Sequence, residues 1–193
     1  MNVYDFDRTI YNGDSTVDFY FFCMWRHKKI LLLLPSLLFA YLKYYVFKKG
    51  NKTEFKESMY KFLRFCDTDK DVEDFWKTHI SKIKKWYIAQ RKADDVIISA
   101  SPEFLLLPCG ELVGFKVIAS KVCSNSGKYD GENCYYNEKV NRFIKEYPND
   151  NINEFYSDHY SDEPLANIAQ KAYIVDKDTI TPWNFNKHLK PHI

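Results

Sequence analysis

The sequence predicts an α/β protein in which helices flank a Rossmann-like parallel sheet and an all-helical cap domain is inserted. Two observations predict this class. After residue 93, short β-branched runs alternate with helical patterns, which is the arrangement of a parallel sheet. Residues 15–92 are instead helical in pattern almost throughout. We therefore expect residues 1–14 and 93–193 to form the α/β core and residues 15–92 to form the cap domain.

The charge of the chain is divided unevenly between these two parts. The formal net charge is only +2, but residues 26–92 hold 17 Lys and Arg against 7 Asp and Glu, and the rest holds 11 against 19. A basic module set into an acidic one suggests an anionic partner for the first and cation binding by the second. The hydrophobic fraction of 46% excludes a disordered chain.

The first strand candidate ends in two carboxylates and a hydroxyl, Asp5, Asp7 and Thr9. Residues two apart in an extended chain share a face, so both carboxylates can converge on one small volume. Their repulsion calls for a bound cation or a shared proton, and Mg2+ is a cation that favours oxygen ligands. One carboxylate could then attack as a nucleophile while the other moves protons. Short acidic patterns more often mark a solvated turn or a helix cap, so the rest of the site must follow in the chain.

Several helical stretches make up the predicted cap domain. A turn that ends at Asp14 and Ser15 offers an N-cap for the first of them. The last two carry apolar stripes at helical spacing, which are typical of a core. The stretches are 18–25, 30–42, 53–65 and 71–89.

The stretch 30–42 has no charged residue and contains Pro35, which would kink it or start a new helix. An uncharged run this short is more often a buried core helix or an interfacial segment than a membrane span, and the first interpretation is a helical hairpin in the cap domain. The alternative is a helix on a membrane surface, with the neighbouring lysines facing anionic headgroups. These lysines are Lys28, Lys29, Lys43, Lys48 and Lys49.

Four further strand candidates follow the cap domain. We expect Ser101 and Pro102 at the N-cap and first position of the helix after the first of these strands. Asp5, Ser99 and Asp158 sit at the carboxyl ends of strands, where parallel sheets bind their ligands. The tail from residue 179 is expected to pack on the surface. The strands are expected at 95–99, 115–119, 154–158 and 172–175, and a helix at 138–147.

The motifs in their order carry a resemblance to a known family. The chain offers Asp5-x-Asp7-x-Thr9, then Ser99, then Lys139, and last Asp158-x-x-x-Asp162. This set resembles the haloacid dehalogenase (HAD) superfamily, in its phosphoserine-phosphatase-like branch (subfamily IB) with a helical cap. The resemblance covers nearly the whole chain. It extends to the segments VIISASPE at 96–103, CYYNEK at 134–139 and YSDHYSDEP at 156–164.

The resemblance implies a role for each motif residue. Asp5 would take the phosphoryl group as an aspartyl phosphate, and Asp7 would protonate the leaving alkoxide and then activate water. Ser99 and Lys139 would donate to the phosphoryl oxygens.

The resemblance also implies a metal site. Mg2+ would be held by Asp5, Asp158 and the main-chain carbonyl of Asp7. Asp162 would orient the metal shell or the lysine, and Thr9 would support the first motif.

The predicted substrate contacts are Asp14, Arg8 and Ser101. Asp14 falls where phosphoserine phosphatases place an acidic substrate contact, and Arg8 where many relatives have glycine. Phe62 stands where those phosphatases use arginine to hold the substrate carboxylate, which argues against phosphoserine. The added apolar length before residue 51 resembles bacterial relatives that dephosphorylate phosphatidylglycerophosphate.

These features predict a Mg2+-dependent phosphomonoester hydrolase that acts on a small phosphorylated metabolite. One alternative is the same chemistry on a membrane lipid phosphate, and another is a non-catalytic anion-binding module. Nucleic acid is not an expected partner, because no recognised motif for it is present. Five cysteines without a C-x-x-C pair, and no signal peptide, favour a cytoplasmic protein or one peripheral to the inner face of the membrane.

Overall fold

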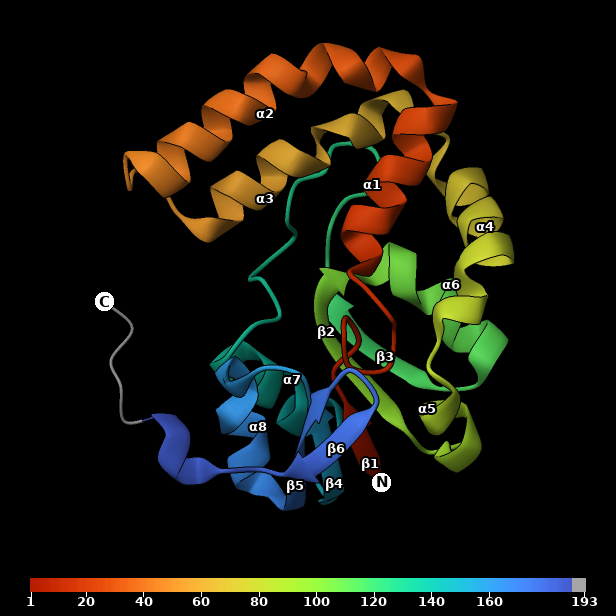
Figure 1. Ribbon diagram of the computed structural model, residues 1–193, viewed down its shortest axis with the longest axis vertical. Coiled ribbons are helices and arrows are strands. Elements are labelled where there is room, and N and C mark those ends of the chain that lie inside the picture. Colours follow the sequence, from red (N-terminus) through yellow and green to blue (C-terminus); the bar gives the residue numbers. More distant parts are fainter. Residues whose placement is uncertain (189–193) are drawn as a thin grey trace.

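The computed structural model describes residues 1–188, and at its centre is a six-stranded sheet (Figure 1). The strand order is β3-β2-β1-β4-β5-β6, and every neighbouring pair is parallel except β5 with β6. The predicted α/β class is thereby confirmed, with a mixed rather than wholly parallel sheet. The strands are β1 (Asn2–Tyr4), β2 (Val96–Pro102), β3 (Lys116–Ser120), β4 (Ile152–Ser157), β5 (Ala169–Asp176) and β6 (Thr179–Pro182).

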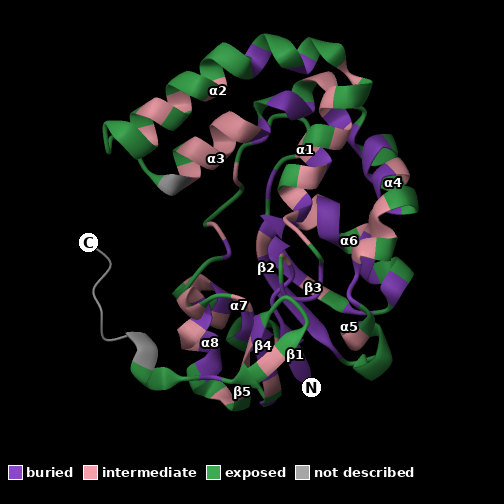
Figure 2. Ribbon diagram, in the orientation of Figure 1, coloured by how far each residue is buried: buried purple, intermediate pink, exposed green. Residues whose placement is uncertain are grey.

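Helices cover both faces of the sheet, because alternate residues of the central strands point to opposite sides. Tyr4 and Ile97 pack in one buried cluster with α4 (Thr68–His79), α5 (Lys85–Gln90) and α6 (Glu103–Val113). Val3 and Val96 pack in the other, with α7 and α8. Figure 2 shows the central strands β1 and β2 buried between these layers, whereas the hairpin of β5 and β6 is more exposed. Helix α7 spans Asn137–Glu146 and α8 spans Glu163–Ile168.

The other helices of the insertion stand beyond one end of the sheet (Figure 1). Asp14 caps α1, since its carboxylate accepts from the Val17 amide at 3.1 Å, and the predicted N-cap is confirmed. We call residues 15–92 the helical insertion. It contains α1 (Ser15–Arg26), α2 (Leu34–Tyr41), α3 (Lys52–Tyr60), α4, α5, and the short turns η1 (Lys28–Leu33), η2 (Leu42–Val46), η3 (Lys61–Phe65) and η4 (Ile80–Lys82).

One buried cluster joins the helical insertion to the sheet. Trp76 of α4 is fully buried, and its indole donates to the Leu105 carbonyl of α6 at 2.7 Å. Its ring meets Phe6 and Tyr11 edge to face, with centroids 6.1 and 5.8 Å apart. Burying aromatic rings of this size dominates the energetics of a core. The insertion therefore packs on the sheet side of the molecule through α4 and α5, and Thr16 of α1 and Lys56 of α3 also reach β2.

The predicted helix at 71–89 is broken in the structure. Ile83 forms an antiparallel bridge with Tyr11, and the Lys84 amide donates to the Ile10 carbonyl at 2.8 Å. These main-chain bonds require extended geometry, so they overrule the helical pattern and leave α4, η4 and α5 as separate pieces.

Two predictions about strands were also wrong. The strand at 95–99 continues to Pro102, so α6 begins at Glu103 and Ser101 is not its N-cap. The register shift between Ser99 and Pro102 marks where this strand bends. Residues 179–182 form the edge strand β6 instead of a surface tail, and the end of the predicted tail, 189–193, lies outside the described residues.

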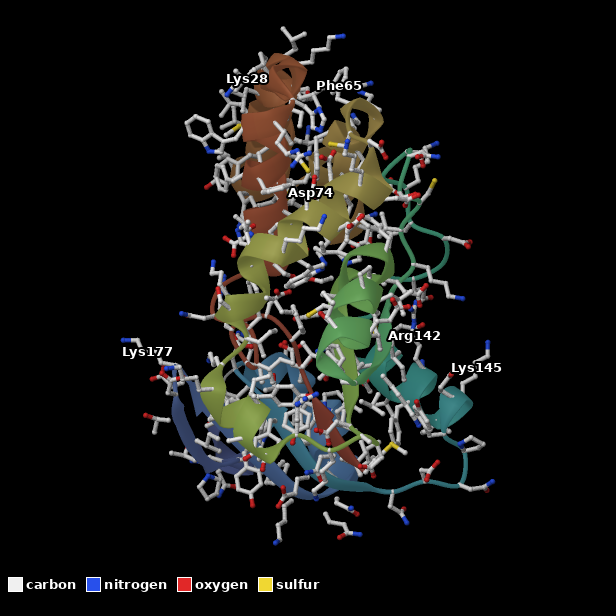
Figure 3. All side chains as sticks on the ribbon, turned by 90° about the vertical axis from the view of Figure 1, so that its right-hand side faces the viewer. Lys28, Phe65, Asp74, Arg142, Lys145 and Lys177 are labelled. Atoms are coloured by element: carbon white, nitrogen blue, oxygen red, sulfur yellow. The ribbon has the colours of Figure 1, made fainter. Side chains whose placement is uncertain are left out.

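The apolar stretch around α2 packs against α3, as the hairpin interpretation of 30–42 expects, but it is not a buried core helix. Pro35 lies in the first turn of α2, so it starts a new helix as one alternative predicted. Of the residues from Lys28 to Val46, all described, only Ile30 and Leu33 are buried. This helical stretch of 19 residues, with mean hydropathy 1.4, is long and apolar enough to cross a membrane by length and composition alone. Figure 3 places Lys28 at the end of the molecule remote from Lys145 of α7.

Candidate active site

The sheet brings Asp5 and Asp158 together at its carboxyl edge. Asp5 follows β1 and Asp158 follows β4, which are parallel neighbours. The amide of Asp5 donates to the Tyr156 carbonyl at 2.9 Å, which fixes the end of β1 against β4. Strand order changes direction at β1, between β2 and β4, and such a switch point leaves a crevice beyond the strand ends. The site predicted from the motifs lies in that crevice.

Lys139 of α7 bridges two carboxylates in the interior. Its Nζ lies 2.8 Å from Asp5 Oδ1 and 2.7 Å from Asp162 Oδ2. All three residues are buried. Ser157 donates to the same Asp162 oxygen at 2.8 Å, a contact that the sequence patterns did not predict. Lys139 therefore holds the Asp5 carboxylate in place and neutralises part of the local negative charge.

Thr9 connects the first motif to the last. Its hydroxyl donates to Asp5 Oδ2 at 3.3 Å and accepts from the Asp158 amide at 2.9 Å. The threonine is fully buried. Asp5 thus has one carboxylate oxygen on Lys139 and the other on Thr9, which leaves little freedom for its side chain to rotate.

Asp7 is held on a different side of the site. Its carboxylate accepts from the Ser15 amide at 2.6 Å and from the Ser101 hydroxyl at 2.5 Å. The Ser101 and Thr16 hydroxyls are 3.0 Å apart. Burial, followed by the nearby Asp14 carboxylate, raises the pKa of Asp7 to about 7. An acid with such a pKa can both donate and accept a proton near neutral pH.

The buried charges leave an excess of carboxylates. Burial raises the pKa of Asp5, and the Lys139 ammonium opposes this only in part. Burial, and then the Asp5 carboxylate, raise the pKa of Asp158 to about 7, although the Arg8 guanidinium lowers it. Burial lowers the pKa of Lys139, but Asp162 and Asp5 outweigh this effect and the pKa is raised. The lysine is therefore charged, and one ammonium faces three carboxylates.

This donor set fits a hard divalent cation. The charge excess raises the pKa of both Asp5 and Asp158, which is the condition that a bound cation would relieve. The donors are carboxylate oxygens, which Mg2+ prefers to nitrogen or sulfur. Asp7 would contribute its main-chain carbonyl, since its carboxylate is already occupied by Ser15 and Ser101.

Two further predicted residues, Ser99 and Arg8, lie near the carboxylates. Ser99 is buried within β2, at the register shift where the strand bends, and not at the strand end as predicted. Its hydroxyl accepts from the Ser101 amide at 3.1 Å. Arg8 has φ 59, in the left-handed region that favours glycine. Its amide donates to Gly13 at 2.8 Å, and its carbonyl accepts from Lys84 Nζ at 2.6 Å. These bonds hold the strained residue in its conformation.

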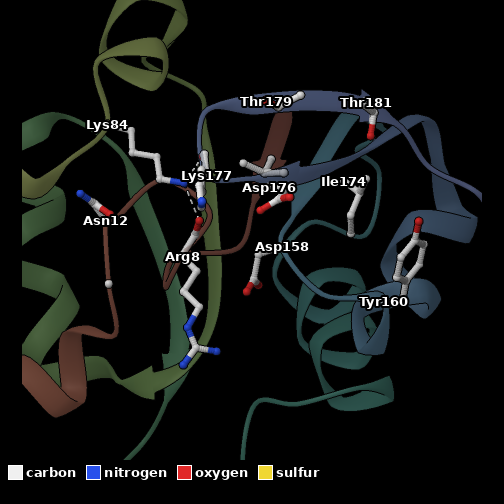
Figure 4. A pocket seen from close by; sticks show the side chains of 12 residues that line it. Arg8, Asn12, Lys84, Asp158, Tyr160, Ile174, Asp176, Lys177, Thr179 and Thr181 are labelled. Atoms are coloured by element: carbon white, nitrogen blue, oxygen red, sulfur yellow. Dashed lines mark hydrogen bonds between the residues drawn. The ribbon is translucent and has the colours of Figure 1, made fainter.

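Two cavities adjoin the carboxylates. One of about 640 Å3 lies between the Arg8 turn and the β5–β6 hairpin (Figure 4). Asp158 lines this cavity beside Arg8, and Lys84 Nζ donates to the Arg8 and Lys177 carbonyls at its rim. This cavity therefore gives access to Asp158 from the side of the β5–β6 hairpin.

The second cavity, of about 230 Å3, lies between the helical insertion and the sheet. We call it the catalytic pocket. Lys56 of α3 lines it, and its ammonium donates to the Ala100 carbonyl at 3.1 Å and to Asn133 at 3.2 Å. Lys56 was not predicted as a site residue, because the pattern of its helix shows an apolar stripe and a lysine on such a helix is usually solvated. The pocket is lined by Asp7, Asp14, Thr16, Val17, Tyr45, Phe55, Lys56, Met59, Tyr60, Ala100 and Ser101.

A family model supports the motif assignment. The model of the haloacid dehalogenase-like hydrolases matches residues 3–167. The chain belongs to this family. The family predicted from the motifs is thereby confirmed, and the chain is a hydrolase by membership.

Solved structures agree with the HAD fold at low sequence identity. A Bordetella pertussis Tohama I protein of unknown function is 17% identical, with TM-score 0.67, and 89% of this chain and 87% of that chain are covered. A phosphoserine phosphohydrolase-like protein from Francisella tularensis is 16% identical, with TM-score 0.53 and coverages of 89% and 86%. A phosphoserine phosphatase solved as a phospho-aspartyl intermediate analogue is 18% identical, with TM-score 0.54 and coverages of 88% and 83%. The sequence matches none of the curated proteins.

Proposed function

We propose that this HAD-family hydrolase is a Mg2+-dependent phosphatase that cleaves phosphomonoesters through an aspartyl phosphate on Asp5. The observation that carries the proposal is the fixed Asp5 carboxylate, with Lys139 on one oxygen and Thr9 on the other. Asp7 follows two residues later and is held by Ser101. A carboxylate nucleophile beside a positioned acid is the arrangement that two-step phosphoryl transfer requires.

In the first step, an Asp5 oxygen forms a bond to phosphorus and the ester P–O bond breaks. Asp7 gives its proton to the departing alkoxide oxygen. In the second step, Asp7 takes a proton from a water molecule whose oxygen attacks phosphorus, which releases inorganic phosphate and restores the Asp5 carboxylate. The chain thus begins and ends the cycle in the same protonation state.

Fixed donors would stabilise the charge that spreads over the phosphoryl oxygens during both steps. Ser99 and Lys139 have the hydroxyl and the ammonium for this task. Bound Mg2+, held by Asp5, Asp158 and the Asp7 carbonyl, would supply further positive charge to the phosphoryl group. Asp162 would keep Lys139 oriented, as its 2.7 Å contact with Nζ suggests.

We assign the helical insertion the role of a cap over the strand ends. This is supported by the catalytic pocket, whose walls come from α1 and α3 on one side and from β2 on the other. A cap excludes water from the reacting group and positions the substrate. Asp14 and Ser101 line the pocket and are the candidate substrate contacts, while Arg8 lies beside Asp158 on the hairpin side.

The catalytic pocket of about 230 Å3 suits a small phosphorylated metabolite, and a cytoplasmic location follows from that choice. Phosphoserine is disfavoured, because Phe62 is buried against Phe19 and Tyr20 and provides no cation for a substrate carboxylate. The exposed apolar stretch around α2, with its flanking lysines, favours a second candidate. In that case the protein would sit at an anionic membrane surface and act on a lipid phosphate.

Turnover of p-nitrophenyl phosphate tests the proposed reaction. Asp5→Asn should lower kcat by more than about a thousandfold, because the amide is a poor nucleophile of nearly the same shape. Asp150→Asn, an exposed loop residue, is the matched control and should keep full activity. EDTA should abolish turnover and Mg2+ should restore it. Full activity in the Asp5→Asn protein would exclude the mechanism, and a wild-type protein that binds phosphate without turnover would be an anion-binding module.

A further inference from the structure

The helical stretch around α2 exposes many large apolar side chains that do not pack in the core. Phe39 is 68% exposed and Leu32 is 76% exposed. Figure 2 shows α2 as largely exposed along its length, in contrast to the strands. Soluble proteins seldom leave so large an apolar area without a partner. The other exposed members are Leu31, Leu34, Leu38, Tyr41, Tyr45, Val46 and Phe47.

Part of this area forms a groove of about 680 Å3 between α2 and α3, which we call the apolar groove. Its α2 wall is a stripe at helical spacing, so these side chains share one face. Its α3 wall consists of Phe55 and Met59, one helical turn apart. The stripe is Leu34, Pro35, Leu37, Leu38 and Tyr41.

The apolar groove adjoins the catalytic pocket. Phe55 and Met59 line both cavities. The α2 stripe also continues by one turn, from Tyr41 in the groove to Tyr45 in the pocket, and the two rings are 4.8 Å apart. A chain attached to a group in the pocket needs only to pass Phe55 and Met59 to enter the groove. Met59 has a flexible side chain that can adapt to such an occupant.

The charge of the helical insertion also bears on which molecule could occupy the pocket and the groove together. Residues 26–92 carry 17 Lys and Arg against 7 Asp and Glu, and Lys56 lines the catalytic pocket. Asp7 and Asp14 line the pocket as well, so its wall is polar and charged, whereas the groove beside it is apolar. A charged pocket that adjoins an apolar groove fits an amphiphile with a polar head.

We propose that the apolar groove binds the hydrocarbon chain of the substrate, so that the substrate class is a phosphomonoester with a long aliphatic chain, a lipid phosphate. The assignment rests on the proposed function, since the phosphate is taken to occupy the catalytic pocket, and it selects the lipid phosphate, the second candidate above, over a small metabolite. The groove holds the chain of the molecule being hydrolysed, and the phosphate end lies near Asp7 and Ser101.

Binding of n-alkyl phosphates tests this assignment without using turnover. The full chain carrying Asp5→Asn is titrated calorimetrically, in Mg2+ and below micelle-forming concentrations, with a series from butyl to dodecyl phosphate. We expect Kd to fall by about fourfold for each added methylene until the groove is filled. Leu38→Asp, which places a charge in the groove at a 60% exposed position, should remove this gain. Leu32→Asp adds the same charge outside the groove and should leave the gain unchanged.

A Kd that does not depend on chain length would overturn the assignment, and so would a gain that survives Leu38→Asp. Binding to phosphatidylcholine vesicles without any chain-length gain would also overturn it, and would mark the face as a membrane anchor. Failure of the proposed function is a separate result. In that case alkyl phosphates bind with the chain-length gain, but the wild-type protein does not hydrolyse p-nitrophenyl phosphate.

Discussion

Replacing Lys139 by methionine should destabilise the protein strongly, and by an amount that depends on pH. Lys139 is 2% exposed, and its ammonium is the cation bonded to both Asp5 and Asp162. Methionine fills much of the space of the aliphatic stem but leaves two buried carboxylates facing each other. Removing one partner of a buried ion pair costs about 3–5 kcal/mol in the free energy of unfolding. We expect a loss of this size at pH 8 in the absence of Mg2+.

The loss should shrink as the pH falls. The pKa of Asp5 is already raised by burial, and Lys139 opposes that rise. Without the lysine, Asp5 takes up a proton more readily in the folded protein than in the unfolded chain. A carboxyl whose folded-state pKa is raised favours folding below its unfolded pKa, and this contribution is lost as pH rises through the folded pKa. Lys139→Met should therefore be closest to wild type in acid.

Urea unfolding followed by circular dichroism measures both effects. Lys145→Met, an exposed position on the same helix, is the matched control and should change the free energy of unfolding by no more than about 0.5 kcal/mol. If Lys139→Met were as stable as Lys145→Met at pH 8, the bridging lysine would not be holding the carboxylates together. A loss that grew toward acid pH would contradict the electrostatic reasoning.

Two further predictions concern residues outside the catalytic centre. Asp95 is fully buried, its Oδ1 has no hydrogen-bond partner, and burial raises the pKa of its carboxyl. Asp95→Asn removes the buried charge, so in thermal scans it should raise Tm above that of the wild type at pH 8 but not at pH 4. Gly127 has φ 72, and an added Cβ would lie 2.6 Å from the Tyr60 main chain, so Gly127→Ala should lower the free energy of unfolding by about 2–4 kcal/mol. Gly131→Ala, with φ 94 and open space around it, should lose only about 1–2 kcal/mol, and equal losses would show that the Tyr60 contact is unimportant.

The strand ends of the site were predictable from the chain because buried strands leave a clear signal. Asp5 and Asp158 each directly follow a strand, and parallel strands bring such ends to one edge. Ser99 follows an apolar run too, but its strand continues to Pro102. Lys139 could be placed only through the family resemblance, since a lysine on a helix is usually solvated. Its bonds to Asp5 and Asp162 depend on packing between α7 and two strands that are distant in the sequence.

The wrong predictions have tertiary causes. Strand β6 is short and ends in Pro182, which suits an edge strand but gives too weak a pattern to detect. The helix expected at 71–89 is interrupted because Ile83 bonds to Tyr11, a partner over seventy residues away in the chain. The groove between α2 and α3 depends on how two helices lie against each other, and neither apolar pattern alone specifies that.

The two connections between the helical insertion and the sheet have a mechanical consequence. On the outgoing segment, the Ser15 amide bonds to the Asp7 carboxylate. On the returning segment, the Lys84 ammonium bonds to the carbonyl of Arg8, the next residue. The two connections are thus bonded to two adjacent residues of one loop, Asp7 and Arg8. If the insertion opens as the proposed cap, its rotation would pull on this loop from both sides, and the opening for substrate would be coupled to the position of the proposed acid, Asp7.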